Sequence, residues 1–112
     1  MKDPRHDDLI QRLNECIAAC EHCADACLDE TDPARMARCM RLDRDCADLC
    51  TLVLRFLARG SEHVNGLLVQ CVMVCRACEQ ECAQHKNAHC QACARACLAC
   101  HTACEEAIDA AA

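Results

Sequence analysis

The sequence has almost none of the residues that build turns, sheets and aromatic cores. Its 112 residues include two Gly, two Pro, one Phe, and no Trp or Tyr. So few turn-forming and aromatic residues exclude a sheet-rich fold and long loops. At this length we expect a single domain spanning residues 1–112, and the fold class that remains is all-α.

Two further absences exclude classes of partner. No window approaches 18 uninterrupted apolar residues, and the amino-terminal MKDPRHDDLIQ lacks the apolar region of a signal peptide, so neither a membrane span nor export is expected. The formal net charge is −6 and the basic residues form no stripe, which argues against nucleic acid as a partner. We therefore expect a cytoplasmic protein. In that reducing compartment cysteines are more often metal ligands than disulfides.

Cysteine is what the sequence has in abundance, at 16 of 112 residues. Most successive cysteines within a group are three or four residues apart, which is the spacing of the buried seam of a helix bundle. The four groups are Cys16, Cys20, Cys23 and Cys27; Cys39, Cys46 and Cys50; Cys71, Cys75, Cys78 and Cys82; and Cys90, Cys93, Cys97, Cys100 and Cys104. This pattern predicts a core in which sulfur replaces aliphatic side chains.

Start and stop signals divide the chain into four helices. Asp3 precedes Pro4 and Asp32 precedes Pro33, and each pair is typical of an N-cap followed by proline at the first helical position. Gly60 is expected to end the second helix. The predicted helices cover approximately residues 4–30, 33–59, 61–86 and 88–110. Such short connections predict an antiparallel up-down-up-down four-helix bundle with a cysteine-lined core.

The two ends of the predicted bundle differ in chemistry. One end gathers apolar residues, which we expect to form a plug: Leu9, Leu13, Val53, Leu57, Val64, Leu68 and Ile108. The other end gathers thioether and imidazole side chains: Met36, Met40, His85 and His89. These four are either exchangeable metal ligands or ordinary gap-filling and helix-end residues. For the two histidines the ligand interpretation is favoured, and this end is the predicted mouth.

Asp43 interrupts the cysteine seam between Cys39 and Cys46. A lone buried carboxylate is costly, so two interpretations stay open: Asp43 is a ligand or hydrogen-bond partner inside the core, or it turns to solvent. The remaining histidines have no comparable context and are expected at the surface: His6, His22, His63 and His101.

Cysteine pairs with four-residue spacing occur seven times. Residues four apart on a helix have Cβ atoms about 5–6 Å apart, and two sulfurs that span one ion need about 4–5 Å, so a helix offers a two-coordinate dithiolate clip. Copper(I) accepts that geometry and prefers thiolate. One monovalent ion per deprotonated thiol also leaves the core neutral, whereas Cys₄ zinc sites would bury negative charge. The predicted capacity is on the order of one copper(I) per cysteine.

Other metal patterns fit less well. Cys97 to His101 matches the CxxCH haem pattern but lies in the middle of a predicted helix, and Cys71 to Cys82 lacks the wrapped loop of a ferredoxin cluster. A zinc or cadmium buffer similar to metallothionein stays the alternative, with an iron–sulfur or haem electron-transfer protein less favoured. No catalytic constellation is apparent, so no enzyme is expected.

Four helices with inward CxxxC pairs and a His/Met end resemble the bacterial four-helix-bundle copper storage proteins, over nearly the whole chain. Without an export signal the chain is most similar to their cytosolic branch. The resemblance implies storage of many copper(I) ions, for detoxification or supply, in a homotetramer, with a copper chaperone as a candidate partner. It further implies that all sixteen cysteines are ligands and that His85 and His89 are entrance histidines.

Overall fold

The computed structural model describes residues 4–111, with side chains described from residue 6 onward. Its elements are α1 (Pro4–Cys27), the 3₁₀ helix η1 (Pro33–Met36), α2 (Ala37–Ala58), α3 (Val64–Ala83) and α4 (Ala88–Ala111). Residues 4–111 contain no strand, which confirms the all-α class. None of the helices described there has both the length and the apolar character needed to cross a membrane.

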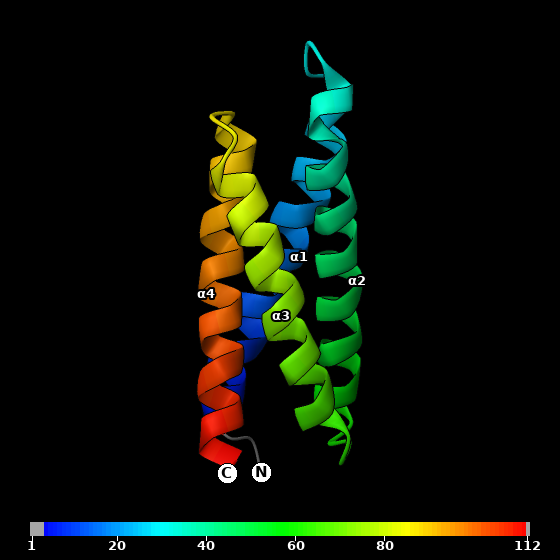
Figure 1. Ribbon diagram of the computed structural model, residues 1–112. Coiled ribbons are helices and arrows are strands. Elements are labelled where there is room, and N and C mark those ends of the chain that lie inside the picture. The colour runs from blue at the N-terminus through cyan, green and yellow to red at the C-terminus, as the bar shows by residue number, and fades with distance from the viewer. Residues whose placement is uncertain (1–3, 112) are drawn as a thin grey trace.

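The four helices form an elongated bundle measuring 49 × 19 × 19 Å. Helix α1 packs against α2 and α4, and α3 packs against the same two helices, so α1 and α3 face each other across the core. Figure 1 shows that the direction of the chain alternates from helix to helix. The α1–α2 and α3–α4 connections lie at the same end of the bundle, away from the start of α1 and the end of α4. The predicted up-down-up-down bundle is confirmed.

The first connection begins earlier than predicted. Helix α1 ends at Cys27 instead of residue 30, because Leu28, Asp29 and Glu30 donate their backbone N–H groups to carbonyls three residues back, in turns tighter than an α-helix. The second helix begins as the 3₁₀ turn η1, and Asp32 makes no side-chain capping bond, contrary to the prediction. Asp3, the other predicted N-cap, lies outside the described residues.

Gly60 ends the second helical segment as predicted. Its φ of +64° is a left-handed conformation that glycine adopts without steric cost, and the Ser61 N–H donates to the Phe56 carbonyl at 3.0 Å, as in a Schellman cap. The third helix starts at Val64 and not at residue 61, because the Ser61 hydroxyl accepts a bond from the His63 N–H in a separate turn.

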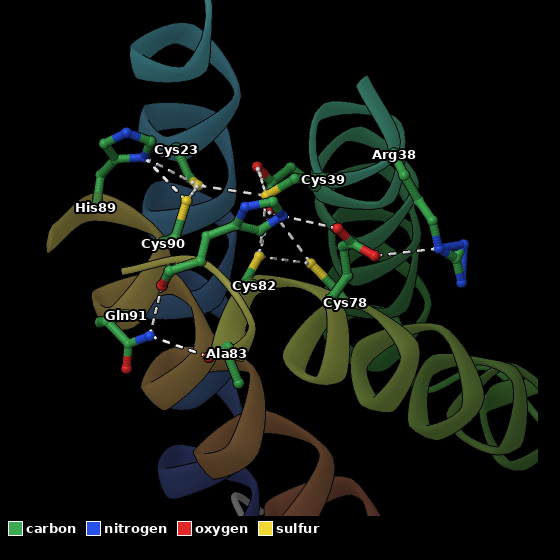
Figure 2. A network of polar contacts seen from close by, with 12 residues as sticks. Cys23, Arg38, Cys39, Cys78, Cys82, Ala83, His89, Cys90 and Gln91 are labelled. Carbon is green, nitrogen blue, oxygen red and sulfur yellow. Dashed lines mark hydrogen bonds and ion pairs between the residues drawn. The ribbon is translucent and has the colours of Figure 1, made fainter. Parts of the chain in front are cut away.

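The third helix also ends early, at Ala83 and not at residue 86. The N–H groups of Gln84 and His85 donate to carbonyls three residues back, which closes the helix with tight turns. The Gln91 side-chain amide then donates to the carbonyls of Ala83 and His85 at 3.1 and 2.6 Å, and so ties the α3–α4 connection to the next helix (Figure 2).

The core is a column of sulfur closed by hydrocarbon at one end. All sixteen cysteines have zero exposed area, and Leu9, Leu13, Val53 and Leu68 are buried beside them. The other predicted plug residues, Leu57, Val64 and Ile108, are partly buried and pack against this core. The apolar plug therefore lies at the end of the bundle where α1 begins and α4 ends.

Candidate metal centre

The cysteines of the four helices converge on one continuous array of free thiols. Across helices, the Sγ atoms of Cys46 and Cys75 lie 3.1 Å apart and those of Cys16 and Cys46 lie 3.6 Å apart. Cys16 is also 3.8 Å from Cys97, so α1, α2, α3 and α4 all contribute sulfur at this level of the bundle. The helical spacing seen in the sequence therefore brings sulfur atoms from all four helices into contact across the bundle.

Groups of four sulfur atoms, each within 4.8 Å of the others, follow one another along the array. They include Cys16, Cys46, Cys50 and Cys75; Cys16, Cys20, Cys46 and Cys97; Cys20, Cys78, Cys93 and Cys97; Cys23, Cys27, Cys39 and Cys90; and Cys50, Cys71, Cys75 and Cys100. Neighbouring groups share members, for example Cys16 and Cys46. A thiolate that belongs to two groups can serve both only as a bridge, so these groups cannot all be independent tetrahedral sites.

The CxxxC pairs are near the geometry of a two-coordinate clip. Their Sγ atoms are 4.0 Å apart in Cys16 and Cys20, and 3.9 Å apart in Cys78 and Cys82. Two metal–sulfur bonds of about 2.3 Å need about 4.6 Å when they are collinear, so a small side-chain adjustment suffices.

The pKa values of the core thiols shift in both directions: hydrogen bonds from Cys23 and Cys82 lower the pKa of Cys39, whereas burial raises that of Cys27. No Lys or Arg is buried among the described side chains, so no fixed cation stabilises thiolates inside the bundle. Burial accordingly raises the pKa of the Cys27 thiol to about 12. A monovalent ion that displaces one thiol proton leaves this charge balance unchanged.

Asp43 lies inside the array, which decides between its two interpretations. Its side chain has zero exposed area, and its Oδ1 accepts thiol contacts from Cys78, Cys82 and Cys93 at 3.3, 3.4 and 3.2 Å. Its Oδ2 is 3.8 Å from Cys39 Sγ. Burial raises the pKa of Asp43 to about 10, so the carboxyl is neutral at pH 7. The structure thus places a carboxyl group at the position in the seam where α2 would carry a fourth cysteine.

His89 is the mouth histidine that reaches the thiols. Its Nδ1 lies 3.3 Å from Cys23 Sγ and 3.6 Å from Cys90 Sγ, and its Nε2 pairs with Glu30 at 2.9 Å. Figure 2 shows the His89 ring directed at these two sulfur atoms. His89 therefore joins the end of the sulfur array to the surface.

His85 adopts a different arrangement. Its Nε2 pairs with Glu81 at 2.7 Å, and Glu81 also pairs with Arg38 at 3.2 Å. The contacts described for the His85 ring include no sulfur atom, so the structure separates the two histidines that the sequence grouped together.

The two mouth methionines differ in burial. Met36 is 5 % exposed and lines a cavity of about 540 Å³ between the α1–α2 and α3–α4 connections, together with Glu30 and His85. Met40 is half-buried and packs against the core. The predicted mouth is thus hollowed and carries one buried thioether.

The prediction for His101 was wrong, whereas His6, His22 and His63 are exposed as expected. His101 is 7 % exposed, because Nε2 pairs with Glu79 at 2.6 Å and Nδ1 with Glu105 at 3.0 Å. Glu79 belongs to α3, so this ion pair joins α3 to α4. The sequence signal for it was His101 and Glu105 four residues apart on one helix face.

Comparison with protein families gives one match over nearly the whole chain. The family model described as "Copper storage protein" matches residues 2–109. Among curated proteins, the uncharacterized cysteine-rich protein YhjQ of Bacillus subtilis is 39 % identical over 76 residues, which are 68 % of this chain and 70 % of YhjQ.

Three solved structures with the same fold contain copper. The copper(I)-bound copper storage protein BsCsp3 superposes with a TM-score of 0.87 at 36 % identity, covering 91 % of this chain and 96 % of that one. A cytosolic copper storage protein from Streptomyces lividans with five coppers gives a TM-score of 0.90 at 39 % identity, covering 94 % of this chain and 92 % of that one. The S. lividans protein Ccsp loaded with ten copper equivalents gives 0.87 at 40 % identity, covering 90 % and 81 %.

Proposed function

The chain belongs to the copper storage protein family, and from that premise we propose that it holds many copper(I) ions on the thiolates that line its bundle. The observation that carries the proposal is the unbroken array of sixteen fully buried thiols. Each copper(I) replaces one thiol proton, so the array fills without accumulating charge. Storage serves either detoxification or supply, and the chain is not an enzyme.

Sharing of thiolates between groups favours copper(I) over zinc. A Cys₄ zinc site carries two net negative charges, and the described core contains no buried Lys or Arg to offset them. Two- and three-coordinate copper(I) instead uses each sulfur as a bridge. A metallothionein-like zinc or cadmium buffer is therefore not favoured, nor is an iron–sulfur or haem protein.

We assign the ligands as follows. All sixteen cysteines bind copper(I), and Asp43 supplies an oxygen among Cys78, Cys82 and Cys93. His89 is the first imidazole ligand at the mouth, and His85 joins it when it leaves Glu81. Met36 and Met40 add thioether ligands along the same route. Copper enters at this end because the opposite end is closed by the hydrocarbon plug.

The wider setting follows from similarity. We infer that the whole chain, residues 1–112, is one copper-binding domain that acts in the cytoplasm, as its cytosolic S. lividans relative does. A homotetramer and delivery by a copper chaperone are the assembly and partner that we propose.

Anaerobic titration of the reduced protein with copper(I), against a chromophoric chelator, tests this function. Saturation is expected at about 12 to 20 copper(I) per chain, with no visible colour. A matched variant with Cys16, Cys46 and Cys50 replaced by Ser should bind about three ions fewer, because capacity follows the thiols. An endpoint near four ions, with zinc competing effectively, would show Cys₄ sites and overturn the proposal.

A further inference from the structure

The cavity at the mouth has a wall whose charge differs from that of the rest of the protein. Its volume of about 540 Å³ is within the range of about 300–1,000 Å³ typical of small-molecule sites. Arg35 from η1 and Lys86 from the α3–α4 connection both line it. The formal net charge of the chain is −6, whereas on this wall Arg35 and Lys86 balance the carboxylates of Glu30 and Asp32.

These two cations are available to a ligand. Among the ion pairs and side-chain hydrogen bonds described within residues 4–111, none involves Arg35 or Lys86. The acidic residues on the same wall are Glu30 and Asp32, and Glu30 is already paired with His89. The cavity wall therefore carries two cations without a described ion pair, beside two carboxylates, those of Glu30 and Asp32.

The same wall leads to the first ligands of the store. Glu30 lines the cavity and holds His89 through Nε2, and Nδ1 of His89 lies 3.3 Å from Cys23 Sγ. Met36, a buried thioether, lies on the cavity wall as well. A molecule seated in the cavity thus meets Met36 and His85 on its wall, and Glu30 links that wall to His89 and, through His89, to Cys23.

Copper(I) that is delivered to a thiol-rich store requires a carrier, because the ion is held by soft ligands and moves by ligand exchange. We propose that this cavity binds the copper(I) complex of a small thiol that carries carboxylates, with Arg35 and Lys86 engaging those carboxylates. An amino group on the same carrier would face Asp32. This inference rests on the proposed copper storage function.

The transfer step balances without any redox change. One copper–sulfur bond to the carrier breaks and one copper–sulfur bond to Cys23 forms, while copper stays in the +1 state. The proton of the Cys23 thiol passes to the carrier thiolate that leaves. His89 occupies a coordination position on the ion during the exchange, so the ion keeps at least two ligands throughout.

A charge-reversal experiment on loading kinetics tests the cavity. The double variant Arg35→Glu with Lys86→Glu is compared with wild type, using copper(I)–glutathione, whose carrier bears carboxylates, and copper(I)–2-mercaptoethanol, whose carrier has none. The control is Arg44→Glu with Arg55→Glu, which makes the same change in net charge at exposed sites of α2 away from the cavity. Loading is followed anaerobically by the ultraviolet absorption of copper–thiolate bonds.

We expect the cavity variant to load from copper(I)–glutathione at least about tenfold more slowly than wild type, and the control within about twofold. From 2-mercaptoethanol both variants should load within about twofold of wild type. Equal slowing by the two double variants, equal slowing with the two carriers, or no slowing would each overturn the proposal. Final capacity is measured in the same samples. A low capacity in wild type would contradict copper storage itself, whereas normal capacity with unchanged rates would contradict only the docking cavity.

Discussion

The Nε2 atom of His89 lies 2.9 Å from Oε1 of Glu30. A carboxylate only accepts hydrogen bonds, so Nε2 is the donor to Glu30, and Nδ1 faces Cys23 Sγ at 3.3 Å. The bond from His89 also holds the pKa of Glu30 below its ordinary value. The α1–α2 connection and the start of α4 together fix an imidazole in the orientation that a soft ion needs.

Replacing Glu30 should therefore affect loading through His89. In Glu30→Ala we expect copper(I) to load about tenfold more slowly, because the ring loses the acceptor that sets its tautomer and orientation. Glu30→Gln should recover most of the rate, since its amide oxygen still accepts from Nε2. Stopped-flow ultraviolet absorption measures both rates, with the exposed neighbour Asp29→Asn as control. Equal slowing in the Ala and Gln variants would contradict this role.

The two mouth histidines should not be equivalent. His89→Ala removes a ring in contact with two sulfurs and should slow loading by about tenfold, whereas His85→Ala removes a ring paired with Glu81 and should slow it by less than about threefold. Both variants should keep their full capacity, because the core thiols remain. The kinetic comparison uses the same chelator-buffered copper(I) for each protein. A larger effect from His85 would mean that the first ligand has been misassigned.

Asp43 should make the metal-free protein lose stability as pH rises. Its pKa is about 10 in the folded state and near 3.9 when unfolded, so between these values the folded state binds more protons. The stabilisation is complete below the unfolded pKa, and the free energy of unfolding then falls by up to about 1.4 kcal/mol per pH unit. Asp43→Asn removes this dependence and should flatten the profile between pH 5 and 8.

Urea unfolding of reduced, metal-free protein at several pH values measures this effect. The exposed neighbour Asp45→Asn is the control and should follow wild type. Parallel profiles for wild type and Asp43→Asn would show that Asp43 is already ionised in the folded protein.

The apolar plug should contribute to the free energy of unfolding and not to the number of copper(I) ions bound. Leu13 has zero exposed area, so Leu13→Ala should lower the free energy of unfolding of the apo protein by about 2–5 kcal/mol. Leu98→Ala, at a side chain that is 47 % exposed, should change it by less than about 0.5 kcal/mol. Thermal or urea unfolding measures both, and copper titration should give wild-type capacity. If Leu13→Ala loads copper(I) faster than wild type, the mouth has been assigned to the wrong end of the bundle.

Periodicity made the array of thiols predictable. Steps of three and four residues put side chains on one helix face, and short connections force neighbouring helices to be antiparallel, so a shared core of cysteines is expected from spacing alone, whereas the contact of Cys46 with Cys75 is seen only in the structure. The positions of the plug and of the mouth follow in the same way.

The orientation of individual polar side chains was not predictable, because it depends on partners far away in the sequence. His89 turns inward because Glu30, 59 residues away, anchors its outer nitrogen, whereas His85, in the α3–α4 connection, is anchored by Glu81, four residues before it. The burial of His101 depends in part on Glu79 of the neighbouring helix. Only the packed bundle shows that Asp43 faces thiols from two other helices.

The complete burial of the sixteen thiols bears on how long the empty store survives exposure to oxidants. Peroxides and alkylating reagents attack thiolates that they can reach, and a buried, protonated thiol such as that of Cys27 is inert to them. The metal-free bundle thus carries a large number of reducing equivalents that are shielded kinetically from its surroundings. The lifetime of that reduced state is set by how often the helices part, and not by the intrinsic reactivity of cysteine.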